Sequence, residues 1–256
     1  MVNNSTWKVK VLKTGEFEVV KAQLTAGKDY SKRLTIPVMV VAIYGNGKKI
    51  LVDTGINDAD WINEAILGDY DASCYQSEKE KLPLVLKESL CWNPEDVDIV
   101  INTHLHYDHC GNNSLFKNAN FIVQKSEWDE AFSPFKLQEA IFYKPLFDHN
   151  AVNYFNWKFV DGEEEVLSGI IVFQTPGHTN GHQSVIVNTE EGVICIAGDI
   201  CNLVENLAEN IPPGLVIDNE KALSSFDEIR KKSKYIIPQH DPCIKNFQVS
   251  DFPNIN

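Results

Sequence analysis

The segment THLHYDHCG, residues 103–111, places four side chains of metal-ligand type within six positions. They are His104, His106, Asp108 and His109. Each is costly to bury without a partner, so a cluster this dense is not typical of a hydrophobic core. Imidazole nitrogen and carboxylate oxygen together suit Zn²⁺, and also iron or manganese. The segment therefore predicts a metal site.

The sequence on either side predicts where this segment lies in the fold. Residues 97–102 are apolar and rich in β-branched side chains, which predicts a buried strand. A glycine and polar residues follow, where the chain must turn. The four side chains then lie at the carboxyl end of a strand, where α/β folds place many sites. Because side chains alternate along an extended chain, His104 and His106 should reach one ion, while Asp108 and His109 reach a second.

One loop supplies too few ligands for such a site, and three later segments repeat the same arrangement. Each is an apolar, strand-like run followed by a ligand-type side chain: His178 after residues 170–173, Asp199 after residues 193–197, and His240 after residues 235–237. This repetition predicts that the four segments meet at one assembled site.

These residues carry a family resemblance. THLHYDHCG, PGHT at 176–179, AGD at 197–199 and QHD at 239–241 resemble, in order, the metal-ligand motifs of the metallo-β-lactamase superfamily, and VDTG at 52–55 resembles the strand end that precedes them. The resemblance runs from about residue 35 to 242. It implies an α/β fold, a four-layer αββα sandwich of two mixed sheets flanked by helices.

The resemblance also implies roles for individual residues. Two divalent cations, Zn²⁺ or else iron or manganese, would be bound by His104, His106 and His178 on one side, by Asp108, His109 and His240 on the other, and by Asp199 as the bridge. Asp53 would hold a ligand loop, as ligating imidazoles usually require. His182 is expected to be a hydrogen-bonding support rather than a ligand.

Within the superfamily, residues 93–113 and PGHTNGHQS at 176–184 are most similar to the N-acyl homoserine lactonase branch, whose members hydrolyse lactone rings. Those lactonases typically carry a Tyr three residues after the bridging Asp, where this chain has Asn202. An amide is shorter than a phenol but still donates a hydrogen bond. Asn202 and Tyr107 are therefore the candidate substrate contacts.

The predicted chemistry is metal-dependent hydrolysis. Two cations about 3.5–4 Å apart lower the pKa of a shared water and polarise a carbonyl. A metal-bridging hydroxide would attack, and Asp108 would pass a proton to the leaving alkoxide. The sequence thus predicts a hydrolase that opens a lactone ring such as that of N-acyl homoserine lactones. A glyoxalase-II-like thioesterase, another hydrolase of this fold and an iron-dependent sulfur dioxygenase are the alternatives.

Length and composition bound the remaining choices. The chain has 256 residues, and its ligand segments span residues 104–240, which favours one domain over residues 1–256. A net charge of −13 without clustered Lys and Arg argues against a nucleic-acid partner. No apolar run approaches a membrane span, and the six cysteines lack a CxxC pair, so a cytoplasmic protein with reduced thiols is expected.

Sequence periodicity predicts the elements around the site. Strands are expected at residues 7–20, 37–44, 48–53, 97–102, 121–124, 170–174, 183–188, 193–197 and 235–237, and helices at 82–91, from 126 to 131 with Ser126 as the N-cap, and from Asp218 or Asn219 with Ala222, Leu223, Phe226 and Ile229 on one face. Strands and helices occur in two sets, before and after about residue 160, which suggests two halves that face each other.

Residues 132–157 are rich in aromatic side chains. Three interpretations are open: a flap or pocket wall that holds an apolar substrate tail, a homodimer interface, and ordinary core packing. His149, within this segment, is expected on the surface or at a pocket rim.

Overall fold

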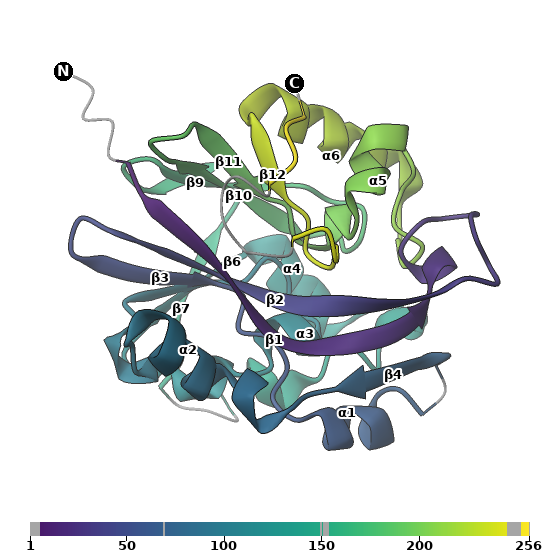
Figure 1. Cartoon of the computed structure of the whole chain (residues 1–256), viewed down its shortest axis with the longest axis horizontal. Helices are drawn as coiled ribbons and strands as arrows, with labels where there is room; N and C mark the ends of the chain where they lie inside the picture. Colours follow the sequence, from purple (N-terminus) through teal and green to yellow (C-terminus); the bar gives the residue numbers. More distant parts are fainter. Residues whose placement is uncertain (1–5, 69, 149, 151–153, 245–251, 256) are drawn as a thin grey trace.

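Two β-sheets face each other in the computed structural model, which describes residues 6–68, 70–148, 150, 154–244 and 252–255 (Figure 1). The first sheet has the order β4-β1-β2-β3-β5-β6-β7, with β1 (Lys8–Val20), β2 (Arg33–Gly45), β3 (Lys48–Val52), β4 (Ala72–Tyr75), β5 (Ile99–Ile101), β6 (Asn120–Gln124) and β7 (Asn156–Val160). The second has the order β12-β11-β10-β9-β8, with β8 (Glu164–Leu167), β9 (Ile170–Gln174), β10 (Gln183–Asn188), β11 (Val193–Ile196) and β12 (Tyr235–Ile237).

Both sheets are mixed, and helices cover their outer faces. Strands β3, β5, β6 and β7 pair in parallel, whereas β1, β2 and β4 pair antiparallel, and in the second sheet only β11 and β12 pair in parallel. The helices are α1 (Ala59–Ala65), α2 (Leu82–Leu90), α3 (Tyr107–Cys110), α4 (Lys125–Phe132), α5 (Val204–Glu209) and α6 (Asn219–Lys232). The predicted αββα sandwich is confirmed, and the change of sheet falls between Val160 and Glu164, as predicted.

Alternate residues of strand β2 pack against different layers of the structure. Its central residues are buried on both faces of the sheet, as expected for a strand covered on both sides. Met39 and Val41 face the second sheet, in a core that also holds Val185 of β10. Val40 and Ala42, which alternate with them, pack with the helix α2 instead. Since the central core draws on both sheets, we propose that the two halves fold as one domain.

Two details of the predicted helices are wrong. Helix α4 begins at Lys125 with Gln124 as its N-cap, so Ser126 lies inside the first turn, where its hydroxyl accepts a hydrogen bond from Gln174 instead of capping. Leu223 is 38% exposed, because it lies about 100° around the helix from Ala222. The other three residues of the predicted face of α6 are buried, and Asp218 is the N-cap.

The aromatic segment is mainly core. Phe142, Phe147 and Phe155 are buried, whereas Phe135 and Tyr143 are exposed. The part of this segment that contains His149 lies outside the described residues.

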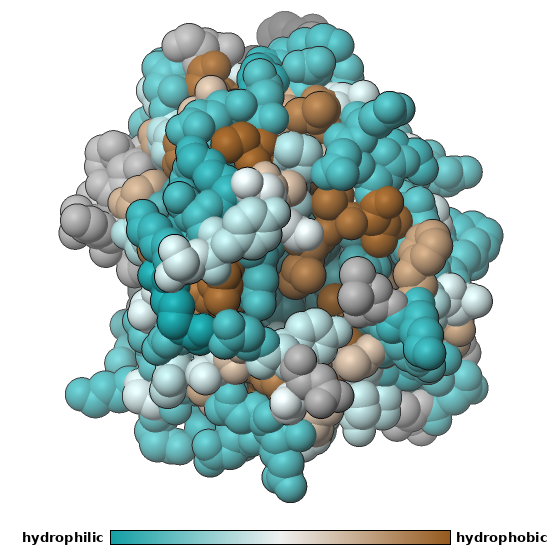
Figure 2. All heavy atoms as spheres, turned by 90° about the vertical axis from the view of Figure 1, so that its right-hand side faces the viewer, coloured by the Kyte–Doolittle hydropathy of each residue, from teal (hydrophilic) through white to brown (hydrophobic). Residues whose placement is uncertain are grey.

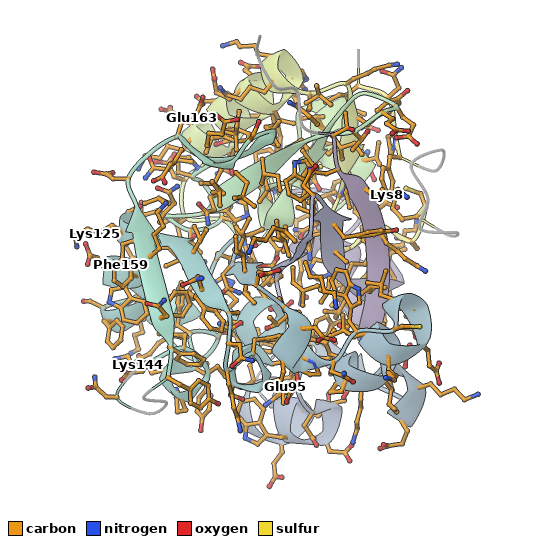
Figure 3. All side chains as sticks on the ribbon, turned by 90° about the vertical axis from the view of Figure 1, so that its left-hand side faces the viewer. Lys8, Glu95, Lys125, Lys144, Phe159 and Glu163 are labelled. Atoms are coloured by element: carbon orange, nitrogen blue, oxygen red, sulfur yellow. The ribbon has the colours of Figure 1, made fainter. Side chains whose placement is uncertain are left out.

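The next strand, β7, continues the aromatic layer at the edge of the first sheet. Figure 3 shows Phe159 of β7 at the margin of the molecule, and its ring lies 5.0 Å from that of Trp128 in α4. Among the described helices, none has the length and hydropathy of a membrane span.

Candidate metal centre

The candidate ligands lie in loops that leave the ends of strands in both sheets. His104 and His106 follow β5, while Asp108 and His109 lie on the short helix α3 that comes next. His178 lies between β9 and β10, Asp199 follows β11, and His240 follows β12. The first sheet thus contributes one continuous segment and the second sheet three separate loops. All seven predicted residues are brought together.

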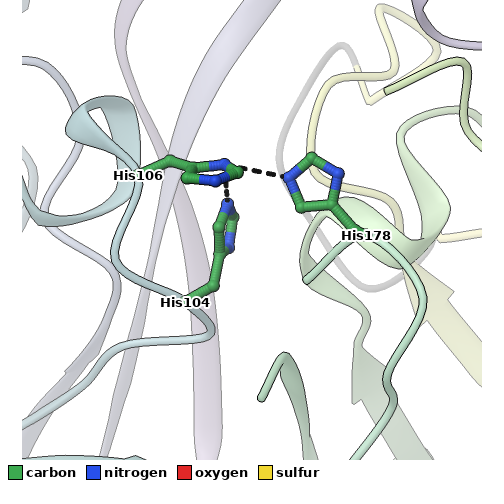
Figure 4. Close-up of side chains that lie close together, drawn as sticks. All are labelled: His104, His106 and His178. Carbon is green, nitrogen blue, oxygen red and sulfur yellow. Dashed lines mark hydrogen bonds between the residues drawn. The ribbon is translucent and has the colours of Figure 1, made fainter. Parts of the chain in front are cut away.

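Three imidazoles form the first group (Figure 4). The Nε2 atoms of His104 and His178 each lie 3.0 Å from Nδ1 of His106. The rings of His104 and His106 are nearly perpendicular, at 84°. Three nitrogen lone pairs converge in this way when imidazoles surround a single cation.

A second group consists of Asp108, His109 and His240. Oδ2 of Asp108 lies 3.5 Å from Nε2 of His109 and 3.7 Å from Nε2 of His240. The side chains of the two histidines are buried, and Asp108 is 9% exposed. This group therefore offers two nitrogens and one oxygen around a second point.

Asp199 lies between the two groups. Its Oδ1 is 3.2 Å from Nε2 of His109 and 3.1 Å from Nε2 of His240. Its Oδ2 lies 3.6 Å from Nε2 of His178, on the other side. One carboxylate oxygen therefore faces each group, which is the geometry that a bridging ligand requires.

The electrostatics differ between the two groups. Burial and the neighbouring imidazoles lower the pKa of His104 and His106 well below the usual value, so both keep free lone pairs. Burial also disfavours the charged form of His109, but the carboxylates of Asp199, Asp108 and Asp53 outweigh it and raise its pKa. Carboxylates that favour a proton on this imidazole also favour a divalent cation beside it.

The residues present fit two divalent cations. Among the described residues, Nε2 of His109 and Oδ1 of Asp199 are buried and have no hydrogen-bond partner. Buried polar atoms are rarely left in this state without a ligand or water. Imidazole nitrogens together with two carboxylates form a donor set suited to Zn²⁺, iron or manganese.

Asp53, directly after β3, supports the second group. Its Oδ2 accepts a hydrogen bond from Nδ1 of His109 at 2.8 Å, which leaves Nε2 of that ring directed at Asp199. The same carboxylate accepts hydrogen bonds from the backbone N–H and the hydroxyl of Thr103. Asp53 has a φ of 61°, a conformation that costs a non-glycine residue energy and is often found at functional sites.

His182 supports Asp199. Burial lowers the pKa of its imidazole to about 3, so the ring is neutral, and its Nε2 accepts a hydrogen bond from the backbone N–H of Asp199 at 3.0 Å. It belongs to neither group of converging ligand atoms. Gly198 makes this contact possible: its φ is 62°, and a Cβ there would lie 2.4 Å from Nε2 of His182.

An apolar cavity of about 90 Å³ adjoins both groups. Tyr107 and Asn202 line it, as do Asp108, His178 and Asp199. Its apolar wall comes from residues that the sequence did not indicate: Phe17, Val19, Leu24, Ile36, Leu67 and Tyr70. From the described part of residues 132–157, Ile141 lines this cavity, whereas Phe132, Phe142 and Tyr143 line a separate pocket. Figure 2 shows hydrophobic side chains around a hollow on the face seen from the right of Figure 1.

This fold and this cluster of ligand-type residues define a metallohydrolase-like α/β sandwich. The family model of the metallo-beta-lactamase superfamily matches residues 34–240, and the chain belongs to that superfamily. An N-acyl homoserine lactonase from a Bacillus species is 32% identical over 231 residues, which cover 88% of this chain and 84% of that protein. A probable metallo-hydrolase from Methanocaldococcus jannaschii is 36% identical over 172 residues, 66% of this chain and 70% of that protein.

Solved structures agree with these relatives. An N-acyl homoserine lactone hydrolase, with the product N-hexanoyl-L-homoserine at its catalytic metal centre, has a TM-score of 0.80 and 28% identity, and the alignment covers 93% of this chain and 95% of that one. The predicted family is confirmed, and the relatives with these names are hydrolases, as the predicted enzyme class requires.

The contact between Gly198 and His182 can be tested by adding one methyl group. Gly198→Ala should lower the free energy of unfolding by roughly 2–5 kcal/mol, because a left-handed alanine costs about 1–2 kcal/mol and the clash adds about 1–3 kcal/mol. Gly47→Ala is the matched control: Gly47 has a φ of 74°, but a Cβ added there would meet nothing within 4 Å, so only the first cost applies. Equal losses for the two variants in urea unfolding would contradict the close contact.

Proposed function

We propose that this protein is a dinuclear-metal-dependent hydrolase that opens the lactone ring of N-acyl homoserine lactones. The observation that carries the proposal is the pair of ligand groups joined by Asp199 at the end of an apolar cavity. The names of its relatives support the substrate class.

The proposed ligands are the residues of the two groups. His104, His106 and His178 would hold one cation, Asp108, His109 and His240 the other, and Asp199 both, with zinc as the proposed metal. When bound, such cations lower the pKa of a water molecule and polarise a carbonyl oxygen. Asp53 and His182 would fix the orientation of ligands that they contact, His109 and Asp199 respectively.

Asp108 is the proposed proton carrier. It belongs to the second group and also lines the cavity, so its carboxylate borders both the reacting centre and the space for substrate. A carboxylate in that position accepts a proton during attack on the carbonyl and delivers it to the ring oxygen as the bond breaks. The apolar wall around it would exclude bulk water and receive the acyl tail.

Asn202 and Tyr107 are the proposed substrate contacts. The side chain of Asn202 is 3% exposed and borders the cavity, and its Oδ1 has no hydrogen-bond partner among the described residues. We propose that its amide binds the polar part of the substrate, where related lactonases typically have a Tyr. The ring of Tyr107 packs edge-on against Phe17 at 6.1 Å, which fixes it as part of the wall.

A panel of substrates tests the proposed reaction. Protein of known metal content should hydrolyse N-acyl homoserine lactones faster than simple γ-lactones, S-lactoylglutathione or a chromogenic β-lactam. The reason is that the apolar cavity beside the ligands would bind the acyl chain. Turnover of the thioester alone would show a glyoxalase-II-like enzyme instead. Oxygen uptake with a persulfide substrate, and no hydrolysis, would show the dioxygenase alternative.

Removing the charge of Asp108 tests the proton carrier. Asp108→Asn should lower kcat about 10²–10⁴-fold, the usual contribution of general acid–base catalysis, while circular dichroism stays unchanged. Metal content must be measured for the same sample, since Asp108 is also a proposed ligand. Turnover near that of the parent protein, at full metal occupancy, would remove Asp108 from the mechanism.

Truncating Asn202 tests the substrate contact. Asn202→Ala should lower kcat/KM for an acyl homoserine lactone roughly 5–150-fold, equivalent to about 1–3 kcal/mol for a lost partner of a buried polar group. Gln23→Ala is the control. Gln23 also has an amide side chain and lines the same cavity, but unlike Asn202 it is not buried. Equal small effects of both variants would show that Asn202 does not contact the substrate.

A further inference from the structure

A buried glutamate lies directly behind the first group of histidines. Glu127 is on the first turn of α4, and its side chain is completely buried. Burying a carboxylate costs several kcal/mol unless hydrogen bonds compensate, so an apolar residue would serve packing better. The hydrogen bonds of Glu127 therefore indicate what it does.

Both carboxylate oxygens of Glu127 bind loops that carry candidate ligands. Oε1 accepts a hydrogen bond from the backbone N–H of Leu105 at 2.9 Å, and Leu105 lies between His104 and His106. Oε2 accepts one from the hydroxyl of Thr179 at 2.5 Å, and Thr179 follows His178. One side chain thus joins the segment after β5 to the loop between β9 and β10.

The backbone around this contact is tightly packed. A Cβ on Gly181 would lie 1.9 Å from the backbone nitrogen of Glu127, so the loop rests directly on the start of α4. The backbone N–H of Gly181 also lies near enough to the Glu127 carboxylate to oppose, in part, the rise in its pKa that burial causes. The loop cannot shift along the helix without losing the hydrogen bond from Thr179 to Glu127.

We propose that Glu127 is a positioning residue that holds His104 and His106 in register with His178, so that the three imidazoles converge on one cation. This rests on the proposed metal site. His178 is held from other sides by Gln138, which donates to its carbonyl at 2.9 Å, and by the Leu215 carbonyl, 2.6 Å from its Nδ1. Those contacts orient His178 alone, whereas Glu127 contacts both loops.

Helix α4 also provides a matched control. Glu130, one turn further along, accepts hydrogen bonds from the backbone and side chain of Asn180, at 2.6 and 3.0 Å. It belongs to the same helix and contacts the same loop, but it does not touch the segment that carries His104 and His106. A loss specific to Glu127 therefore separates alignment of the two loops from general loosening of one.

The test measures cobalt affinity, because Co²⁺ bound to nitrogen and oxygen ligands has a visible spectrum that reports its geometry. Metal-free protein is titrated with Co²⁺ against a competing chelator, and folding is checked by circular dichroism. Glu127→Ala should weaken Co²⁺ binding by the three-histidine group about 10–100-fold and change the absorption bands of that site, as is typical when a group that orients ligands is lost. Glu127→Gln should restore most of the affinity, since its amide still pairs with Leu105 and Thr179. Glu130→Ala should bind as the parent does.

Three outcomes would overturn the proposal: parent-like affinity and spectrum in folded Glu127→Ala, an equal loss in Glu130→Ala, or no recovery in Glu127→Gln. If Glu127→Ala does not fold, Thr179→Val decides, because it removes one hydrogen bond of the pair and keeps the shape of the side chain. Unchanged affinity in that variant overturns the proposal, and a loss of about tenfold supports it. Hydrolysis by the parent is assayed separately, so a wrong substrate class does not affect this result.

Discussion

The carboxylate of Asp199 faces two groups of imidazoles at once, and the rest of the site depends on that placement. Its two oxygens lie between 3.1 and 3.6 Å from nitrogens of His109, His240 and His178. These partners come from loops of both sheets, so the strand ends that carry the loops must lie side by side. A backbone hydrogen bond of 2.9 Å from the N–H of Gln183, at the start of β10, to the carbonyl of Thr103 holds these strand ends together. The position of a single carboxylate therefore constrains how the two sheets are arranged.

Burying so many polar side chains works against stability unless charge is balanced. Burial opposes ionisation of Asp199, but His109 and His240 outweigh it and lower the pKa of the carboxyl group. Burial and mutual repulsion meanwhile keep the imidazoles of the first group neutral. Neutral nitrogens on one side and carboxylates on the other make a cavity that favours cations and excludes anions. Such local conflict with good core packing is expected at functional sites.

The structure brings the candidate ligands together as the sequence predicted, because their signal is local. Each lies just after an apolar run, and a strand that ends there places its next residues at the edge of the sheet. The cavity wall gave no such signal: Phe17 and Ile36 look like ordinary core residues, and only the pairing of β1 with β2 brings them beside the site. Glu127 was missed for the opposite reason, because a glutamate in an amphipathic helix is normally assigned to the exposed face. The cavity wall and the role of Glu127 depend on tertiary contacts, which sequence periodicity does not reveal.

The two buried carboxylates, Asp53 and Glu127, support the site by different kinds of contact. Asp53 contacts the imidazole of His109 in the second group directly and also holds Thr103, which precedes His104, whereas Glu127 contacts only backbone and hydroxyl groups that flank the first group. Direct contact changes the charge distribution of a ligand, while contact through the backbone changes only its position. Loss of Asp53 would therefore change the electronic properties of the second group, whereas loss of Glu127 would change the geometry of the first group. This difference matches the proposed chemistry, since Asp108, the proposed proton carrier, belongs to the second group.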